Sequence, residues 1–223
     1  MKVTTDGCLF GSLSPTLPKG EGVLKMLDVG TGTGLLSLMY AQKSPSVKID
    51  AIEIDKDAAK QANENAKSSP WANRINIINE DAKSFSFDKK YDLIISNPPF
   101  YEAEIEAENE KKNLAHHSGG LLLDELLLII KNNLAQDGLF FLLLPYKRNL
   151  EIRTALAKHE FDIIQITFVR QSVKHDYFRL MLLGKNKTTR PVETVLNEIS
   201  ICDEHQQYTK EFTDLLKDYY LHL

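Results

Sequence analysis

Short apolar runs alternate with helical stretches along most of the chain, and this alternation strongly limits the possible folds. The runs that predict strands are Val23–Val29, Val47–Glu53, Arg74–Ile78, Tyr91–Ser96 and Leu139–Leu144. The stretches between them that predict helices are Gly34–Ser44, Asp55–Ser68 and Leu121–Leu134, with Asp55 expected as an N-cap. Strands that alternate with helices form parallel sheets. We therefore predict an α/β fold with a Rossmann-like, doubly wound sheet.

The C-terminal third of the chain departs from this alternation. A helix is expected over Lys147–His159, followed by two strands, Phe161–Val169 and Phe178–Leu183, that pair antiparallel. A further strand over Val192–Ile201 and an amphipathic helix over Tyr208–Leu221 complete the chain. No internal repeat or long linker divides it. We predict one domain over residues 1–223, with seven strands, the last antiparallel, and a small C-terminal addition over residues 191–223.

Composition excludes several classes of protein. The chain is 43% hydrophobic and 26% charged, which is ordinary for a globular domain. Its two cysteines, Cys8 and Cys202, form neither a disulfide framework nor a metal-binding spacing. No apolar run approaches the ~18 residues of a membrane span, and no signal peptide is visible. We expect a cytoplasmic protein without a metal or a membrane anchor, and a monomer.

A glycine-rich loop, Asp28–Gly34, lies between the first predicted strand and the first predicted helix. Glycines in such a loop let backbone N–H groups approach a ligand closely. In the dinucleotide-binding motif the third glycine follows the first by five residues, whereas here Gly34 follows Gly30 by four. A carboxylate at Asp28 would repel a pyrophosphate and attract an ammonium group. The loop therefore predicts S-adenosylmethionine, which carries an amino-acid end and no phosphate.

Two further acidic residues follow predicted strands. Glu53 ends the second strand, where it could accept hydrogen bonds from ribose hydroxyls. Asp81 follows the third strand, where it could meet the adenine amino group. Three acidic residues at successive strand ends favour a ligand-binding site. The alternative is a glycine-rich turn with a purely structural role.

The tetrapeptide Asn97-Pro98-Pro99-Phe100 ends the fourth predicted strand, which should lie beside the first at the switch point of the sheet. The Asn97 side-chain oxygen and the Pro98 carbonyl could accept both hydrogens of a planar amino group. That would aim the nitrogen lone pair at a methyl donor, while Phe100 offers a face for stacking a base. Catalysis would then depend on positioning and electrostatics. The structural alternative is a strand stopped by proline.

With the glycine loop and this tetrapeptide the chain resembles class I amino-group methyltransferases, which act on adenine, guanine or a glutamine of release factors. The resemblance is closer to the bacterial valine-tRNA adenosine methyltransferases, which modify adenosine 37 beside the anticodon. It rests on Met1–Gly7, Leu27–Leu38, Ala51–Ala66, Ser69–Ile75 and Tyr91–Phe100. The stretch Ser-Pro-Trp-Ala-x-Arg-Ile, in which x is any residue, is the most family-specific part.

The resemblance implies roles for individual residues. The cofactor-binding residues would be Asp28, Gly30, Gly32, Gly34, Glu53 and Asp81. Residues 1–20 would cover the cofactor, with Thr5 and Asp6 in contact with it. The residues that hold the target adenine would be Asn97, Pro98, Pro99 and Phe100. Phenylalanine replaces the family's commoner tyrosine at position 100, so stacking is kept and a hydroxyl is lost.

Charge is unevenly distributed. The net charge is −4, yet Lys147–Arg190 has ten basic and four acidic residues, a local +6 against −10 elsewhere. We predict RNA contact by Arg170, Lys174 and Arg179, near one hairpin; a solvated surface is the alternative. His116, His117 and the acidic stretch Glu102–Glu110 are interpreted as solvated, with catalysis or a lid as alternatives.

The predicted activity is methyl transfer from S-adenosylmethionine to the N6 amino group of a tRNA adenosine. Three alternatives remain open. A protein glutamine methyltransferase uses the same tetrapeptide but normally adds a helical N-terminal domain. A ribosomal RNA guanine methyltransferase usually has a duplicated domain. The alternative without enzymatic activity is an RNA-binding scaffold that retains the fold.

Overall fold

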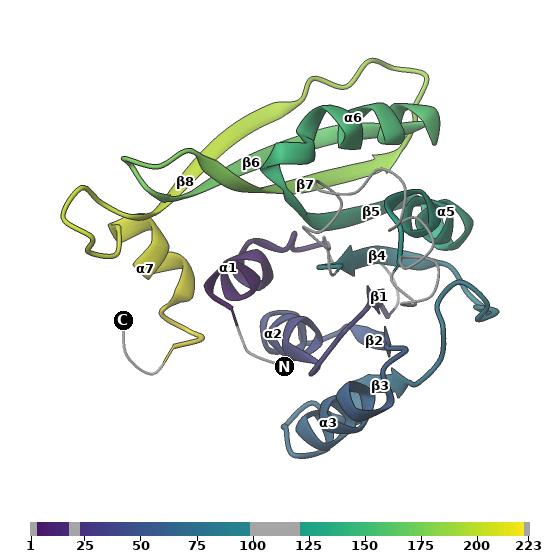
Figure 1. Cartoon of the computed structure of the whole chain (residues 1–223). Helices are drawn as coiled ribbons and strands as arrows, with labels where there is room; N and C mark the ends of the chain where they lie inside the picture. Colours follow the sequence, from purple (N-terminus) through teal and green to yellow (C-terminus); the bar gives the residue numbers. More distant parts are fainter. Residues whose placement is uncertain (1–3, 18–22, 99–120, 221–223) are drawn as a thin grey trace, which may run out of the picture.

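The computed structural model describes residues 4–17, 23–98 and 121–220, and its centre is one eight-stranded sheet (Figure 1). The strands are β1 (Lys25–Val29), β2 (Lys48–Ile52), β3 (Ile75–Ile78), β4 (Tyr91–Ser96), β5 (Leu134–Pro145), β6 (Phe161–Ser172), β7 (Tyr177–Asn186) and β8 (Val195–Cys202). The helices are α1 (Thr5–Leu13), α2 (Leu35–Lys43), α3 (Lys56–Lys67), α5 (Leu123–Asn133), α6 (Asn149–Lys158) and α7 (Lys210–Leu216), with short 3-10 turns η1 (Ala72–Arg74) and η3 (Tyr146–Arg148).

The strand order is β3-β2-β1-β4-β5-β7-β6-β8. Strands β1 to β5 are parallel, and β7 runs antiparallel between β5 and β6. This confirms the doubly wound sheet and the antiparallel hairpin. The predicted count of seven strands was wrong, because β8 joins the sheet in parallel beside β6. The sequence predicts this strand but not its partner. Only the folded chain shows that β6 has a free edge, which β8 covers.

Two hydrophobic cores cover the two faces of the sheet. One lies beneath α1, α2 and α7, and contains Phe10, Tyr40 and Phe212. The other lies beneath α5 and α6, and contains Leu126 and Phe140. Figure 1 shows α1 between α2 and α7 on one side of the sheet, and α6 on the other. The central strand β4 is largely apolar because helices bury both faces of the sheet there.

The segment before the glycine loop forms a packed helix, which the sequence did not indicate. Thr4 caps α1, since its hydroxyl accepts a hydrogen bond from the Gly7 amide at 3.3 Å. The Phe10 ring stacks on Phe141 of β5, with ring centroids 4.5 Å apart. At the other end of α1, the Lys43 ammonium donates to the Ser12 carbonyl at 2.8 Å. The second half of α1 is therefore fastened to the rest of the domain.

The largest boundary differences from the prediction are at the start of β5 and in the last helix. The fifth strand was predicted to begin at Leu139, but β5 begins at Leu134, directly after α5. The last helix, α7, starts after its Thr209 cap and is shorter than predicted. Tyr208 forms an isolated bridge with the end of β8 instead of helix. Asp55 caps α3 as predicted, accepting from the Ala58 amide at 2.8 Å.

Candidate active site

The carboxyl ends of β1, β2 and β4 bring the predicted site residues to one edge of the sheet. Val29 pairs with Ile52 on one side and with Ser96 on the other. The residues that follow these three are Gly30, Glu53 and Asn97. The Ser96 hydroxyl donates to the Val29 carbonyl at 2.7 Å, which ties β4 to the start of the glycine loop. The structure therefore places the two principal motifs side by side.

The glycine loop has a backbone that other residues adopt only with strain. Gly30 has φ +72° and Gly34 has φ +84°, both in the left-handed region. A Cβ atom at Gly30 would meet no atom within 4 Å, so the loop is open on that side. A Cβ atom at Gly34 would lie 3.4 Å from the Ala62 Cβ, because α3 packs closely there. Gly34 serves packing, whereas Gly30 leaves space that a ligand can occupy.

Asp28 is fully buried at the end of β1, and only half of its carboxylate is satisfied. Its Oδ2 accepts hydrogen bonds from the Thr31 and Ser37 hydroxyls, each at 2.7 Å. Its Oδ1 has no hydrogen-bond partner. Burial raises the pKa of Asp28 to about 6, against the opposing effect of the two hydroxyl donors. An ammonium group would satisfy Oδ1 and compensate the buried charge.

Glu53 is buried and holds the glycine loop through its own carboxylate. Its Oε2 accepts from the Gly32 amide at 2.8 Å, and its Oε1 accepts from the Asp55 amide at 2.9 Å. Each carboxylate oxygen can accept a second hydrogen bond, so contact with ribose hydroxyls stays a prediction. Spacing alone could not reveal that Glu53 also fixes the loop, because Gly32 lies 21 residues away in sequence.

Asp81 lies in the turn after β3 and is partly exposed. Its Oδ1 accepts from the Lys83 amide at 2.9 Å, which shapes the turn. Asn79, which sequence reasoning missed, donates from its side chain to the Glu53 carbonyl at 2.9 Å. That bond joins the β3 turn to the end of β2. Contact of Asp81 with an adenine amino group stays a prediction.

Asn97 is exposed at the end of β4, and Pro98 behind it is buried. The first turn of α1 lies next to the Asn97 side chain: a Cβ atom at Gly7 would be 3.9 Å from Asn97 Nδ2. Thr5 and Asp6 belong to the same turn of α1, and their contact with the cofactor stays a prediction. Other predicted positions lie outside the described residues, namely Pro99, Phe100, His116, His117 and the stretch 102–110.

The three predicted RNA-contact residues are all engaged within the protein. Arg170 donates to the Ser200 hydroxyl at 2.7 Å and lies 3.7 Å from Glu198 of β8. Lys174 donates to the Glu204 carbonyl at 3.0 Å. Arg179 pairs with Asp6 of α1 at 3.0 Å. Residues of the C-terminal addition, among them Glu198, thus lie beside the basic segment 147–190. The local charge of +6 was counted along the sequence, so it leaves out these neighbours in space.

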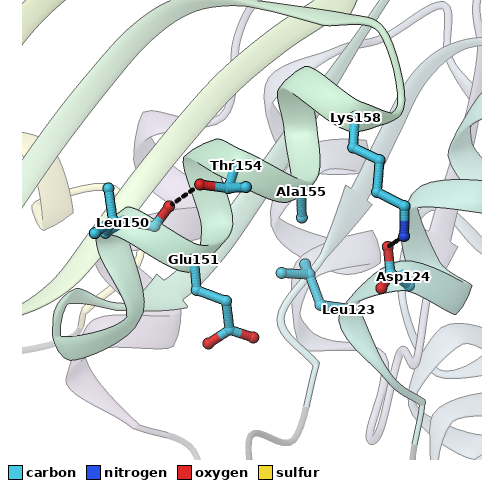
Figure 2. A pocket seen from close by; sticks show the side chains of 7 residues that line it. All are labelled: Leu123, Asp124, Leu150, Glu151, Thr154, Ala155 and Lys158. Atoms are coloured by element: carbon cyan, nitrogen blue, oxygen red, sulfur yellow. Dashed lines mark hydrogen bonds and ion pairs between the residues drawn. The ribbon is translucent and has the colours of Figure 1, made fainter.

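A hollow of about 470 Å³ between α5 and α6 lies away from the glycine loop. Figure 2 shows its apolar floor at Leu123 and Ala155, and the Lys158–Asp124 ion pair of 3.3 Å at its rim. Among the described residues, no group of three metal-binding side chains occurs, and no helix is long and apolar enough to cross a membrane.

The sheet order and the site at its carboxyl edge define a class I S-adenosylmethionine-dependent methyltransferase. Residues 12–164 match the family model described as "Methyltransferase small domain". A tRNA1(Val) (adenine(37)-N6)-methyltransferase of Flavobacterium johnsoniae is 35% identical over 225 residues, which covers 99% of this chain and 93% of the relative. The chain belongs to the tRNA1(Val) (adenine(37)-N6)-methyltransferase family.

Solved structures show the same fold at low sequence identity. A predicted O-methyltransferase from Agrobacterium tumefaciens superposes with a TM-score of 0.72 at 15% identity, covering 96% of this chain and 97% of that chain. The glycopeptide N-methyltransferase MtfA, solved with S-adenosyl-L-methionine, superposes with a TM-score of 0.57 at 12% identity, covering 82% and 87%. The architecture predicted from the sequence is therefore confirmed, apart from the strand count.

Proposed function

We propose that this protein transfers a methyl group from S-adenosylmethionine to the N6 amino group of adenosine 37 in valine tRNA. The observation that carries the proposal is the position of Asn97, beside a glycine loop whose buried Asp28 has an unsatisfied oxygen. The names of the full-length relatives supply the tRNA and the position. This substrate implies a cytoplasmic protein, and one chain supplies every proposed site residue, which is consistent with a monomer.

The residues at the carboxyl edge fit the chemical groups of the cofactor. Asp28 Oδ1 would accept from its ammonium group, Gly30 leaves space beside the loop, and Glu53 and Asp81 would face the ribose and the adenine. When bound, the cofactor supplies a methyl group activated on a sulfonium. We assign Thr5 and Asp6 to the rim of this site, because α1 begins next to Asn97.

Asn97 and Pro98 would orient the acceptor. The Asn97 side-chain oxygen and the Pro98 carbonyl would each accept one hydrogen of the adenine amino group, and Phe100 would stack on the base. The nitrogen would then present its lone pair to the methyl group; the N–C bond would form as the methyl–sulfur bond breaks with its electron pair going to sulfur, and the methylated nitrogen would release one proton to solvent. Because these acceptors are held by the backbone at a strand end, the geometry is set before the substrate arrives.

The target base has to be unstacked to reach this edge, and an anticodon loop presents purines in that state. We propose that Arg170 and Lys174 contact the phosphates of the stem-loop, since both lie at the β6–β7 hairpin on the same edge of the sheet. Phosphate contact would compete with their internal partners, Ser200 and the Glu204 carbonyl. The same role for Arg179 stays a prediction from sequence.

The test is methylation of a valine-tRNA transcript by wild-type protein and by Asn97→Ala. We expect the variant to lose about 100-fold in kcat, or roughly 3 kcal/mol, because a preorganised acceptor at the reacting centre is lost. Its affinity for S-adenosylmethionine should stay within about twofold, since Asn97 serves the acceptor. The exposed Asn73→Ala variant is the matched control.

Changing the substrate separates the alternatives. A transcript with guanosine at position 37 should accept no methyl group. Methylation of a release-factor peptide in place of the transcript would identify a protein glutamine methyltransferase. Methylation of ribosomal RNA guanine in its place would identify a ribosomal RNA guanine methyltransferase. Binding of tRNA without methyl transfer would support the scaffold alternative.

A further inference from the structure

The first turn of α1 is connected to β7 by an ion pair that joins distant parts of the sequence. Asp6 Oδ2 lies 3.0 Å from Arg179 Nε, across 173 residues of chain. The other oxygen, Oδ1, accepts from the Gly7 amide at 3.0 Å. The Asp6 side chain is 15% exposed and the Arg179 side chain 32% exposed, so the ion pair is partly buried. One carboxylate therefore fixes both the turn of α1 and its attachment to the sheet.

This turn forms one wall of the proposed acceptor site. A Cβ atom at Gly7 would be 3.9 Å from Asn97 Nδ2 and 3.9 Å from Leu35 Cδ2. It would also be 3.1 Å from the Thr4 hydroxyl, so the turn has little free space. A displacement of α1 at this end would change the surroundings of the Asn97 side chain directly.

Arg179 is held in a rigid position from which to act on α1. Its backbone lies within β7, paired with Pro145 of β5 and with Val169 of β6. Its guanidinium lies 5.4 Å from the centre of the Phe178 ring. Since β5 and β6 flank it on both sides, Arg179 is a fixed anchor, whereas α1 is joined to the sheet only by packing and side-chain bonds.

We propose that Arg179 is a positioning residue for methyl transfer: through Asp6 it fixes the first turn of α1 against Asn97. The inference rests on the proposed function and concerns the same site. It gives Arg179 a role other than phosphate contact, and the two roles differ in their kinetic effects. A positioning residue changes kcat, whereas a phosphate contact changes the KM for RNA and its salt dependence.

The test compares Arg179→Ala, Arg179→Lys and Asp6→Asn with wild-type protein. Arg179→Ala and Asp6→Asn should each lower kcat roughly tenfold to 100-fold, because a small misplacement at a reacting centre has effects of that size. The double variant Asp6→Asn/Arg179→Ala should lose no more than either single variant, since both remove one interaction. Arg179→Lys should recover part of kcat, because an ammonium can still pair with Asp6. The salt dependence of RNA binding should stay unchanged.

Thiol labelling provides a readout that does not need activity. Cys8 lies in α1 and is buried, and Cys202 of β8 is equally buried and serves as an internal reference. Mass spectrometry of peptides after labelling should show faster modification of Cys8 in Arg179→Ala and Asp6→Asn, with Cys202 unchanged. Lys210→Ala removes the exposed Lys210–Asp214 ion pair and is the matched control, with wild-type labelling and kinetics expected.

Two results would overturn the proposal. The first is wild-type kcat with a raised KM for RNA and a flatter salt dependence in Arg179→Ala, which would identify a phosphate contact. The second is unchanged Cys8 labelling in both Arg179→Ala and Asp6→Asn. If wild-type protein methylates no RNA, the proposed function fails, and the labelling still decides whether the pair holds α1. Thermal unfolding of each variant separates local opening from loss of the fold.

Discussion

Replacing Asp28 by asparagine should stabilise the protein at pH 8 while weakening its binding of S-adenosylmethionine. The pKa of Asp28 is raised from 3.8 to about 6 because the side chain is buried. A shift of about two units at ~1.4 kcal/mol per unit means that the ionised carboxylate costs about 3 kcal/mol of folding stability. In the variant, the amide NH2 group would take the position of Oδ1, where no hydrogen-bond acceptor is available. This unpaired buried donor costs ~1–2 kcal/mol of folding stability. The net gain at pH 8 is about 1 kcal/mol.

The sign of this difference should reverse with pH. A carboxyl group whose pKa is higher in the folded protein binds its proton more tightly there, so wild-type stability rises as pH falls from above 6 to below 4. At pH 4 or below, the ionisation cost is absent and only the cost of the unpaired amide remains. The Asp28→Asn variant should then be the less stable protein by ~1–2 kcal/mol.

Cofactor affinity should change in the opposite direction to stability. Loss of a charge-assisted hydrogen bond to the ammonium group, worth ~1.5–3 kcal/mol, corresponds to roughly tenfold to 100-fold weaker binding. In wild-type protein, affinity should fall as pH drops through about 6, where Asp28 becomes protonated. Urea denaturation across pH values and titration calorimetry measure both effects, with the exposed Asp57→Asn variant as control. A stability difference that is independent of pH would refute the reasoning.

Three further substitutions test the packing that supports the site. Gly184→Ala should lower the free energy of unfolding by roughly 1–3 kcal/mol, because the added Cβ would be 2.3 Å from the Phe140 ring. Urea denaturation measures this change. A variant as stable as wild-type protein would mean that the ring can move away. Gly34→Ala should lower the free energy of unfolding by ~1–2 kcal/mol, because alanine is strained at a φ of +84°. The melting temperature should fall, and it should also fall in an Ala62→Gly background, where the neighbouring Cβ is absent. Phe212→Ala should lower the free energy of unfolding by ~3–5 kcal/mol in urea denaturation, since this side chain of α7 is fully buried in the core; a smaller loss would show that α7 contributes little to stability.

The parallel half of the fold could be predicted because its signals are local. Asp55 precedes a helix and caps it, and Tyr91–Ser96 is a mainly apolar run that becomes a strand with those bounds. Helix α1 was missed because Gly7 and Gly11 resemble loop residues in sequence. The structure needs glycine at Gly11 for a different reason: a Cβ atom there would lie 2.5 Å from the Met39 sulfur, where α1 meets α2.

The residue types of the candidate site could be predicted, but their connections could not. Asp28 was identified from the chemistry that a carboxylate allows beside a glycine loop. The bonds of Asp6 to Arg179 and of Arg170 to Ser200 join elements that are distant in sequence. No spacing rule relates such positions, because strand order, and not chain order, decides which side chains meet.

The contact of α1 with α7 has a consequence for the protein while it is being synthesised. Domains emerge from the ribosome starting at the N-terminus. Residues 5–13 pack against residues 210–216, so α1 cannot reach its final place until nearly the whole described chain has been made. Until then its buried face, Cys8 to Gly11, lacks one of its partners and is exposed to chaperones or to aggregation. The nascent chain can form the glycine loop early, yet α1 can complete its packing only after α7 has been translated.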